Sequence, residues 1–308
     1  MPWATSGPRP GLSSWSRRIA ELKTFATNPV PEAKRSIPCA LCGGTSFAPA
    51  WNCGDFAFVA CRRCGLLQQN PQSEPEAVAA RYDEAYLRYE EANQYAYRDL
   101  ELLALADLEL AAAAAPLFER ARRKGRRPRV LDVGCATGAL LAALRDAGWE
   151  PQGVEISEAQ ARYGRERHGL PIFAGSLEAA AFPGASFDLV HASHLIEHLN
   201  SPGSFLDEAA RVLAPGGFLV LTTPNADGFQ ARLRGPKWRS AIYDHLYLFS
   251  LRTLRALLES KGFAVTRSAT WGGWPQGMHP AFIKRPLDSL AKRCGFGDVM
   301  AVLARRTV

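Results

Sequence analysis

The sequence predicts an α/β protein with a doubly wound, mainly parallel sheet and a small cysteine-rich module in front of it. Residues 129–141 read RVLDVGCATGALL, which is an apolar strand, a turn of small residues and a helix. From residue 129 onward, strand-like and helix-like stretches alternate, as in parallel sheets covered by helices. Two pairs of closely spaced cysteines precede this region.

Each expected element has its own local signal. Ser201 and Pro202 suit the N-cap and first position of a helix, and Gly125 to Pro128 separate a helical stretch from the first strand. We expect strands at 130–133, 152–156, 171–175, from Phe187, and at 218–225, 263–267 and 299–304. We expect helices within 91–121, at 139–147 and 158–168, from residue 201, and at 250–261.

The turn after the first of these strands is the strongest functional signal. Gly134 and Gly138 are four residues apart, whereas a dinucleotide-binding turn has the spacing G-x-G-x-x-G. Asp132 lies two residues before the first glycine, and Glu155 ends the next strand, where a carboxylate can bind two ribose hydroxyls. The alternative is an ordinary strand–helix turn in some other α/β protein.

This region resembles the class I S-adenosylmethionine (SAM) methyltransferases, whose first motif is D/E-x-G-x-G-x-G. The stretches PFPGASFDLVHASHLIEHL and LxPGGxLxxxxPN are similar to later motifs of that family. The resemblance implies a Rossmann-like, seven-stranded sheet whose last strand is antiparallel and lies between strands five and six. Two positions depart from the pattern, because Ala136 replaces the middle glycine and Gly175-Ser176-Leu177 replaces an acidic residue near the adenine.

The resemblance also implies a set of cofactor-binding residues and an activity, methyl transfer from SAM. The expected cofactor contacts are Asp132, Gly134, Cys135, Ala136, Thr137, Gly138, Glu155, Ile156, Ser176, Leu177 and Ser193. Ser176 is expected to hydrogen-bond the adenine, and Leu177 to contact it.

The cysteine pairs predict a structural zinc site, a zinc ribbon. Cys39 and Cys42 are followed, after eighteen residues, by Cys61 and Cys64. Four thiolates form a closed tetrahedral site with no open position, which distinguishes structural from catalytic zinc. The alternative is two redox or unpaired C-x-x-C motifs. We read Cys53, Cys135 and Cys294 as ordinary thiols.

The same opening resembles bacterial methyltransferases that carry a zinc ribbon ahead of the SAM domain, many of which act on sugars or other biosynthetic intermediates. That resemblance implies that the ribbon helps to shape or cover the substrate site. It resembles the ubiquinone-pathway O-methyltransferases as well.

A group of histidines follows the fourth and fifth strands. His194, Glu197 and His198 are spaced to share one face of a helical turn, and His245 follows the next strand. One hypothesis makes His198 or His245 a general base for an alcohol acceptor. A second makes all four residues ligands of a divalent metal that binds the acceptor oxygen. A third gives the Glu-His pair a structural role.

The metal hypothesis rests on a further resemblance, to the E-x-x-E-H plus distant His arrangement of small-RNA 2′-O-methyltransferases and some ubiquinone-pathway enzymes. His194 replaces the first glutamate of that pattern, which favours a softer metal than magnesium.

The remaining segments suggest how the chain is organised. We expect a flexible basic tail at 1–36, the ribbon at 37–72, a helical linker or cover at 73–125, and the methyltransferase domain at 126–308. Ser73 and Glu76 can form a capping box at the start of the linker helix. Aromatic residues in 226–249, with Trp271 and Trp274, suggest an acceptor pocket or lid.

Composition bounds the partners. The net charge is +7, and basic residues gather in the N-terminal tail and at 120–129, without the basic-aromatic repeat of a nucleic-acid-binding surface. No apolar run approaches a membrane span, and Arg17-Arg18 precede no apolar export region, so we expect a cytoplasmic protein.

The sequence therefore predicts a methyltransferase acting on a small molecule, such as a hydroxyl of a sugar, nucleotide-sugar or secondary-metabolite intermediate. O-methylation is favoured and C-methylation stays open. The alternatives are an RNA methyltransferase that uses the ribbon and basic residues, and a non-catalytic SAM-binding protein.

Overall fold

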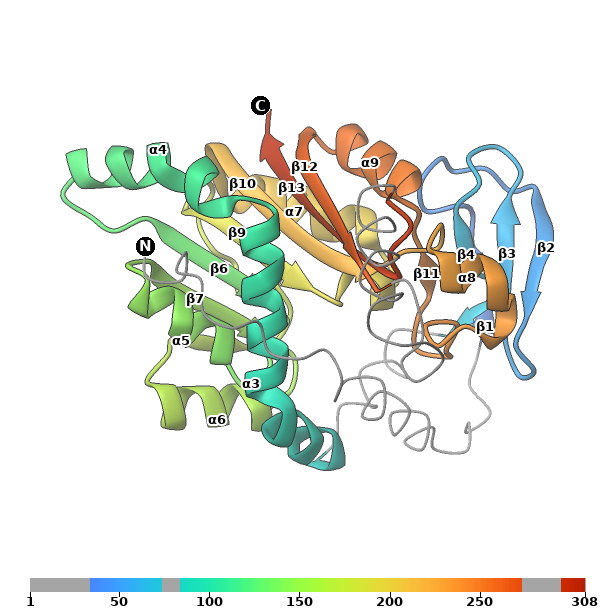
Figure 1. Cartoon of the computed structure of the whole chain (residues 1–308), viewed down its shortest axis with the longest axis horizontal. Helices are drawn as coiled ribbons and strands as arrows, with labels where there is room; N and C mark the ends of the chain where they lie inside the picture. The colour runs from blue at the N-terminus through green and yellow to red at the C-terminus, as the bar shows by residue number, and fades with distance from the viewer. Residues whose placement is uncertain (1–33, 74–83, 273–294, 308) are drawn as a thin grey trace, which may run out of the picture.

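The computed structural model describes residues 34–73, 84–272 and 295–307. Its main sheet has seven strands in the order β12-β13-β10-β9-β6-β7-β8 (Figure 1). These strands are β6 (Arg129–Val133), β7 (Glu150–Glu155), β8 (Ile172–Ala174), β9 (Phe187–Ser193), β10 (Leu213–Pro224), β12 (Phe263–Trp271) and β13 (Val299–Arg306).

Strand direction confirms the predicted fold class. The pairs β10–β9, β9–β6, β6–β7 and β7–β8 are parallel, whereas β13 is antiparallel to both of its neighbours, β10 and β12. The last strand of the chain therefore lies between the fifth and sixth strands, as expected for a Rossmann-like methyltransferase sheet.

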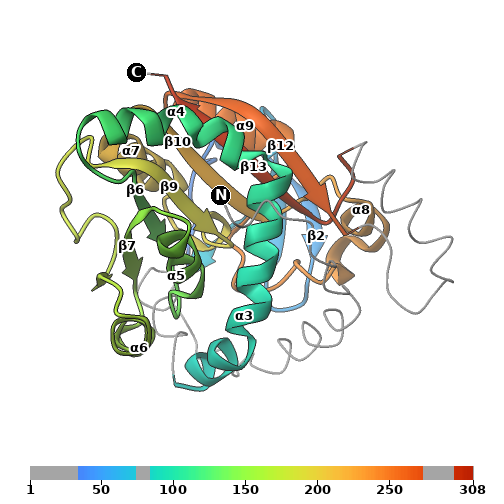
Figure 2. The same cartoon turned by 60° about the vertical axis from the view of Figure 1, so that its left-hand side comes forward.

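Helices cover both faces of this sheet (Figures 1 and 2). One face carries α3 (Glu84–Asp107), α4 (Leu110–Arg123), α5 (Ala139–Asp146) and α6 (Glu158–His168). Leu105 and Leu117 of this group pack in one core cluster with Leu141 and Leu189. The opposite face carries α7 (Pro202–Val212) and α9 (Leu251–Ser260), whose leucines pack in a second cluster.

A buried carboxylate ties α4 to the beginnings of the central strands. The side chain of Asp188, near the start of β9, is fully buried. It accepts hydrogen bonds from Arg126 Nη1 at 2.6 Å, Arg120 Nη2 at 3.0 Å and the backbone N–H of Arg129 at 3.0 Å. Burial alone would raise the pKa of Asp188, but these donors outweigh it and lower the pKa.

The cysteine-rich region forms a second sheet that shares a strand with the larger domain. Its order is β11-β4-β3-β2, with β2 (Phe47–Asn52), β3 (Ala57–Cys61), β4 (Leu67–Gln69) and β11 (Tyr247–Leu248). Its core is continuous with that of the larger domain, because Cys39, Cys61 and Leu66 belong to the cluster that contains Leu246 and Phe249. The domain boundaries proposed from the sequence stay a prediction.

One local expectation at the edge of this region differs from the structure. Residues 34–35, placed in the tail, form β1 (Lys34–Arg35), which pairs with β5 (Gln72–Ser73). Ser73 ends β5, and its hydroxyl contacts Tyr243 Oη at 2.9 Å. Glu76, the second residue of the expected capping box, and the N-terminal tail up to residue 33 lie outside the described residues.

Two other local expectations are corrected. Strand β10 begins at Leu213, although its regular pairing with β9 resumes only at Phe218. Trp271 ends β12 and donates a hydrogen bond to Asp107, so it is not a loop residue. Ser201 and Pro202 occupy the N-cap and first position of α7 as expected, although the Ser201 hydroxyl contacts the hydroxyl of Ser204 and no backbone N–H of the helix. Trp274 and Cys294 lie outside the described residues.

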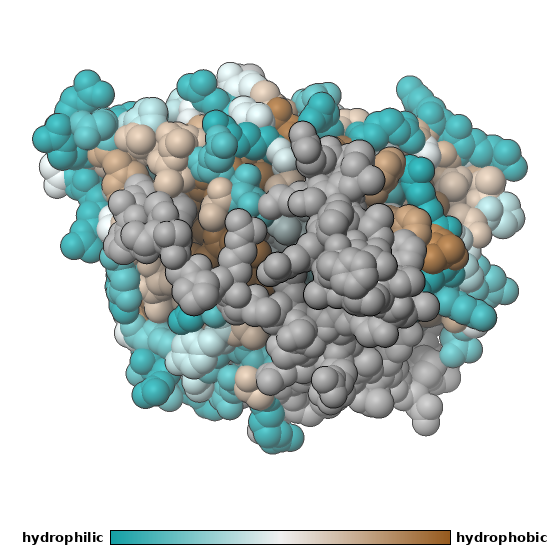
Figure 3. Space-filling view, viewed as in Figure 1, coloured by the Kyte–Doolittle hydropathy of each residue, from teal (hydrophilic) through white to brown (hydrophobic). Residues whose placement is uncertain are grey.

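The surface of the molecule carries mainly hydrophilic residues. Hydrophilic residues line the outer margin of the face shown in Figure 3, with apolar residues showing through toward its middle. No helix in the described part of the chain combines the length and apolar character needed to cross a membrane.

Candidate active site

The turn between β6 and α5 has the backbone form that a ligand-binding turn requires. Gly134, Ala136 and Gly138 have φ values of 73°, 47° and 79°. The middle position therefore uses the left-handed region even though it carries a Cβ, which explains why relatives of this motif have glycine there. A Cβ on Gly138 would lie 2.7 Å from Leu170 Cδ1, so close packing also requires glycine at this position.

Glu155, at the end of β7, lies beside this turn. Its Oε2 accepts a hydrogen bond from the N–H of Ala136 at 2.9 Å, and its Oε1 accepts one from the N–H of Ser157 at 2.9 Å. Burial is the main influence on this carboxyl group and raises its pKa. Each oxygen retains a further lone pair, so the buried carboxylate fits the role of accepting two ribose hydroxyls.

The residues expected around the adenine fall into different environments. Ile156 is 51% exposed directly after Glu155, so it presents apolar surface at the strand end. Leu177 is 3% exposed and packs in the core, and the Ser176 hydroxyl accepts a hydrogen bond from the Ala179 N–H. Ile156 is thus free to contact an adenine, whereas Leu177 supports the loop from below.

Helix α3 adds an acidic residue that sequence reasoning missed. The carboxyl of Glu101 is hydrogen-bonded to Ser193 at the end of β9 and lies near Asp132 and His191. Burial raises the pKa of Glu101 to about 7. His191 Nδ1 contacts Asp132 Oδ1 at 2.7 Å, and although burial would lower the pKa of His191, Asp132 raises it overall. Asp132 therefore orients His191 beneath the turn.

Three of the four residues in the predicted histidine group come together. One ligand atom from each of Glu197, His198 and His245 lies within 4.8 Å of the others. Glu197 and His198 belong to the short helix η4 (Ile196–His198) after β9, and His245 belongs to the segment before β11. The imidazole centroids of His198 and His245 are 4.7 Å apart.

Backbone carbonyls orient both imidazoles. His198 Nδ1 lies 2.9 Å from the carbonyl oxygen of Asp244, and His245 Nδ1 lies 2.8 Å from that of Ser240. Because a carbonyl oxygen can only accept, each Nδ1 is the hydrogen-bond donor, and Nε2 is the ring nitrogen left to face the group. Burial is the main cause that lowers the pKa of His245, to about 3, so this ring is neutral.

Glu197 supplies the negative charge of the group. Its side chain is fully buried, and its Oε2 accepts a hydrogen bond from Thr223 Oγ1 at 3.0 Å. Its Oε1 accepts no well-aligned hydrogen bond from the described residues, although His194 Nδ1 lies 3.3 Å away. Burial would raise the pKa of Glu197, but the nearby histidines, His194 first, lower it to about 2.

His194 stands apart from the other three. It has φ 50° and a side chain that is 49% exposed, and its Nδ1 lies 3.3 Å from Glu197 Oε1. Leu195, the next residue, lies against the cofactor turn, since a Cβ on Gly134 would be 3.4 Å from Leu195 Cδ1. The loop after β9 therefore connects the Glu197 group directly to the turn after β6.

Comparison with known proteins agrees with this arrangement. The family described as "Methyltransferase domain" matches residues 103–268. The chain belongs to this family. A Mycolicibacterium smegmatis protein described as a probable S-adenosylmethionine-dependent methyltransferase is 33% identical over 142 residues, 44% of this chain and 52% of that protein. A ubiquinone biosynthesis O-methyltransferase of Thiobacillus denitrificans is 32% identical over 104 residues, 32% of this chain and 44% of that protein.

The chain thus spans about half the length of the curated relatives it matches. Among solved structures, a SAM-dependent methyltransferase of Thermotoga maritima has a TM-score of 0.50 and 21% identity, covering 74% of this chain and 98% of that one. This likeness supports the methyltransferase fold.

The four ribbon cysteines form a second cluster on the opposite side of β4. The sulfur atoms of Cys39 and Cys64 are 3.4 Å apart, those of Cys42 and Cys61 are 3.5 Å apart, and all four lie within 4.8 Å of one another. These separations suit four thiolates around one Zn²⁺ with bonds of ~2.3 Å. Cys53 and Cys135 lie outside the cluster as free thiols.

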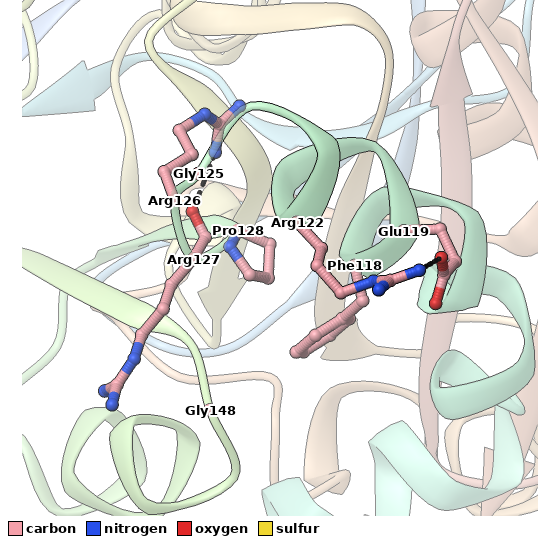
Figure 4. Close-up of a pocket in the computed structure, with 8 residues that line it drawn as sticks. All are labelled: Phe118, Glu119, Arg122, Gly125, Arg126, Arg127, Pro128 and Gly148. Carbon is pink, nitrogen blue, oxygen red and sulfur yellow. Dashed lines mark hydrogen bonds and ion pairs between the residues drawn. The ribbon is translucent and has the colours of Figure 1, made fainter.

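An open hollow of about 540 Å³ lies at the other edge of the sheet, between the end of α4 and the start of β6 (Figure 4). Two of its three lining arginines, Arg122 and Arg126, bind other groups of the chain. Arg126 binds Asp188 and the carbonyl of Arg127, and Arg122 pairs with Glu119. This hollow is remote from the carboxyl ends of the strands, where ligands bind in such sheets, so it is not the active site.

Three of the aromatic residues proposed for an acceptor pocket prove to be core residues. Trp238, Tyr247 and Phe249 are each at most 1% exposed, whereas Phe229 is 37% exposed on α8 (Phe229–Arg234). The spacing of these aromatic residues in the sequence does not distinguish core positions from binding positions, because aromatic side chains serve both packing and binding.

Proposed function

We propose that the protein transfers a methyl group from SAM to a hydroxyl group of a small molecule. The turn between β6 and α5, the buried carboxylate of Glu155 and membership of the methyltransferase family support the cofactor. The observation that favours an oxygen acceptor is the convergence of Glu197, His198 and His245, two of which belong to the loop whose Leu195 lies against that turn.

An alcohol acceptor must lose its proton, which a sulfonium methyl donor does not help it to do. Two imidazoles and one carboxylate are a donor set that binds divalent transition metals. A divalent cation held there would lower the pKa of a hydroxyl that it binds. We therefore propose that Glu197, His198 and His245 hold such a cation, with His194 at the rim.

The chain's own residues prepare this site. Hydrogen bonds from each Nδ1 to a backbone carbonyl orient both rings and leave Nε2 free. Thr223 holds one oxygen of Glu197, while the other accepts no well-aligned hydrogen bond from the described residues and has His194 Nδ1 3.3 Å away. A metal-free base is the second candidate, and His198 suits it better than His245, whose burial makes it a weak proton acceptor.

We propose further that the four cysteines hold a structural zinc ion, because four ligands leave no open position. A small-molecule acceptor is favoured over RNA, since Arg120 and Arg126 of the basic segment are committed to Asp188. The ubiquinone biosynthesis O-methyltransferase among the relatives supports transfer to oxygen, and C-methylation of a sugar remains a second outcome for the assay.

The test of the enzyme proposal uses SAM carrying a CD₃ group. The protein is incubated with a panel of alcohols, phenols and sugar nucleotides and with a metabolite extract, and products are identified by their mass shift. We expect a deuterated methyl ether. A labelled carbon would redirect the proposal to C-methylation, and transfer to no acceptor would leave a non-catalytic SAM-binding protein.

The test of the metal proposal is Mn²⁺ binding followed by electron paramagnetic resonance, because thiolate sites bind Mn²⁺ poorly. We expect Glu197→Gln to weaken Mn²⁺ binding by at least about a hundredfold, and Glu119→Gln, on the exposed face of α4, to leave it unchanged. His245→Ala should lower turnover while SAM binding persists. Absence of Mn²⁺, Co²⁺ or Zn²⁺ binding outside the ribbon would reject the metal and leave the histidine base.

A further inference from the structure

Strand β4 of the ribbon is bonded to the segment that carries His245. In register, Gln68 pairs with Tyr247 and Leu67 pairs with Leu248 across the β4–β11 pair. The backbone N–H of Gln69 continues this pairing by donating to the carbonyl of Leu246 at 2.8 Å. The ribbon is therefore joined to the larger domain at the residues next to His245.

The side chain of Gln69 makes a second set of contacts with the same segment. Its Nε2 donates to the carbonyls of Tyr243 and His245, each at 2.8 Å, and it is 3.5 Å from that of Ile242. The residue is 2% exposed, so water cannot readily replace these bonds. One buried amide thus holds the carbonyls of Tyr243 and His245, on either side of Asp244.

The segment held by Gln69 in turn contacts the other two members of the Glu197 group. The N–H of Leu246 donates to the carbonyl of Glu197 at 2.8 Å. The carbonyl of Asp244 accepts from His198 Nδ1 at 2.9 Å. A shift of residues 244–246 would therefore move His245 and release bonds to both Glu197 and His198.

The cysteine turns fix β4 from the other side. The N–H of Cys61 donates to the carbonyl of Leu66 at 2.9 Å, immediately before β4 begins. Gln68 Oε1 accepts from the N–H of Ala40, between Cys39 and Cys42, at 3.3 Å, and its Nε2 donates to the Pro38 carbonyl at 3.4 Å. The two neighbouring glutamines of β4 thus bond in opposite directions, one to the cysteine turns and one to the active-site segment.

We propose that Gln69 is a positioning residue for the Glu197 group, and that through it the four-cysteine ribbon sets the place of His245. The effect of Gln69 on the rate of methyl transfer rests on the proposed function, whereas its effect on the position of residues 242–246 does not. The ribbon then acts as part of the catalytic framework, beyond shaping or covering the substrate site.

The test compares Gln69→Met with Gln152→Met in the full chain. Both changes replace a glutamine whose Nε2 donates to two backbone carbonyls, but Gln152 bonds to Gly153 and Pro171 beside β7. Measurements are hydrogen–deuterium exchange of peptides covering 240–249, Mn²⁺ affinity, SAM affinity, zinc content and steady-state kinetics.

For Gln69→Met we expect exchange in 240–249 to become at least about tenfold faster and Mn²⁺ affinity to fall at least about tenfold. We expect kcat to fall by about ten- to a hundredfold, which is the cost of misplacing a reacting group by ~1 Å. SAM affinity and zinc content should stay within about twofold of wild type. Gln152→Met should leave all of these values unchanged.

Unchanged exchange in 240–249, or faster exchange with unchanged kcat and Mn²⁺ affinity, would overturn the proposal. If the wild-type protein transfers no methyl group, the proposed function fails, while the exchange comparison still decides whether Gln69 holds the segment. If Gln69→Met does not fold, Tyr243→Phe, which removes the 2.9 Å contact between its hydroxyl and Ser73, loosens the same segment and gives the comparison on a smaller scale.

Discussion

Replacing Glu155 by Gln tests the cofactor site most directly. The substitution keeps the shape of the side chain but turns one oxygen into an NH₂ group. The carboxylate accepts hydrogen bonds from the N–H groups of Ala136 and Ser157, each at 2.9 Å. Because an NH₂ group cannot accept, one of these two N–H groups loses its partner in the variant. It also removes the negative charge that would strengthen hydrogen bonds from the ribose.

The expected size of the effect follows from the number of bonds at stake. A hydrogen bond to a charged group contributes about 1.5–3 kcal/mol, and each ~1.4 kcal/mol changes a dissociation constant tenfold. Losing one ribose bond and weakening the other should therefore raise the Kd for SAM by about ten- to a hundredfold. The orphaned N–H should also lower the free energy of unfolding by about 1–3 kcal/mol.

Isothermal titration calorimetry with SAM and with S-adenosylhomocysteine measures the change in Kd. Glu150→Gln is the matched control, because Glu150 begins the same strand and forms an exposed ion pair with Arg129. Its Kd should equal that of wild type. A Glu155→Gln protein that is folded and binds SAM within about twofold of wild type would refute the assigned role of this carboxylate.

Three further predictions concern stability. Asp188→Asn should lower Tm at pH 7 by about 4–8 °C, since it weakens a buried ion pair by about 2 kcal/mol. Because the pKa of Asp188 is lowered in the folded protein, its contribution to stability is present above the unfolded pKa of about 4 and is lost as pH falls through the folded pKa. A plot of Tm against pH should show this loss at acid pH in wild type. An equal loss in Asp188→Asn would contradict the assignment. The four cysteines of purified protein should hold one zinc ion per chain, measured by plasma mass spectrometry. Releasing this zinc with a mercurial should lower Tm. An unchanged Tm after zinc release would argue against a structural site. Gly138→Ala should destabilise the fold by about 1–3 kcal/mol in urea titrations, because the residue has φ 79° and a Cβ would meet Leu170 at 2.7 Å; a loss below about 0.5 kcal/mol would show that the turn relaxes.

The alternation of strands and helices was predictable because each element of the larger domain has its own signal. Buried parallel strands are apolar runs, as in Phe218–Leu221, and glycine or proline interrupts the chain between elements. The strand pairing of residues 247–248 has no such signal, because a two-residue strand is too short for a period to be visible. The sharing of β11 with the ribbon therefore could not be read from the sequence.

The candidate site was predictable only where a motif carried it. The turn residues and Glu155 follow a fixed spacing, and the spacing of Glu197 and His198 with a distant His245 suggested the three-residue group that the structure brings together. Glu101 lies in a helix rich in leucine and alanine, where a glutamate ordinarily faces water. Its burial depends on the way α3 crosses the sheet, which is a property of tertiary packing and not of local pattern.

The strand shared between β4 and β11 limits how the molecule can be engineered. A fragment that began at residue 126 would leave the edge of β11 without its partner and uncover Leu246 and Phe249, which pack with Cys61 and Leu66. An unpaired strand edge beside newly exposed apolar surface favours aggregation. Chimaeras that exchange the ribbon between homologous enzymes would therefore need to exchange residues 242–249 along with it.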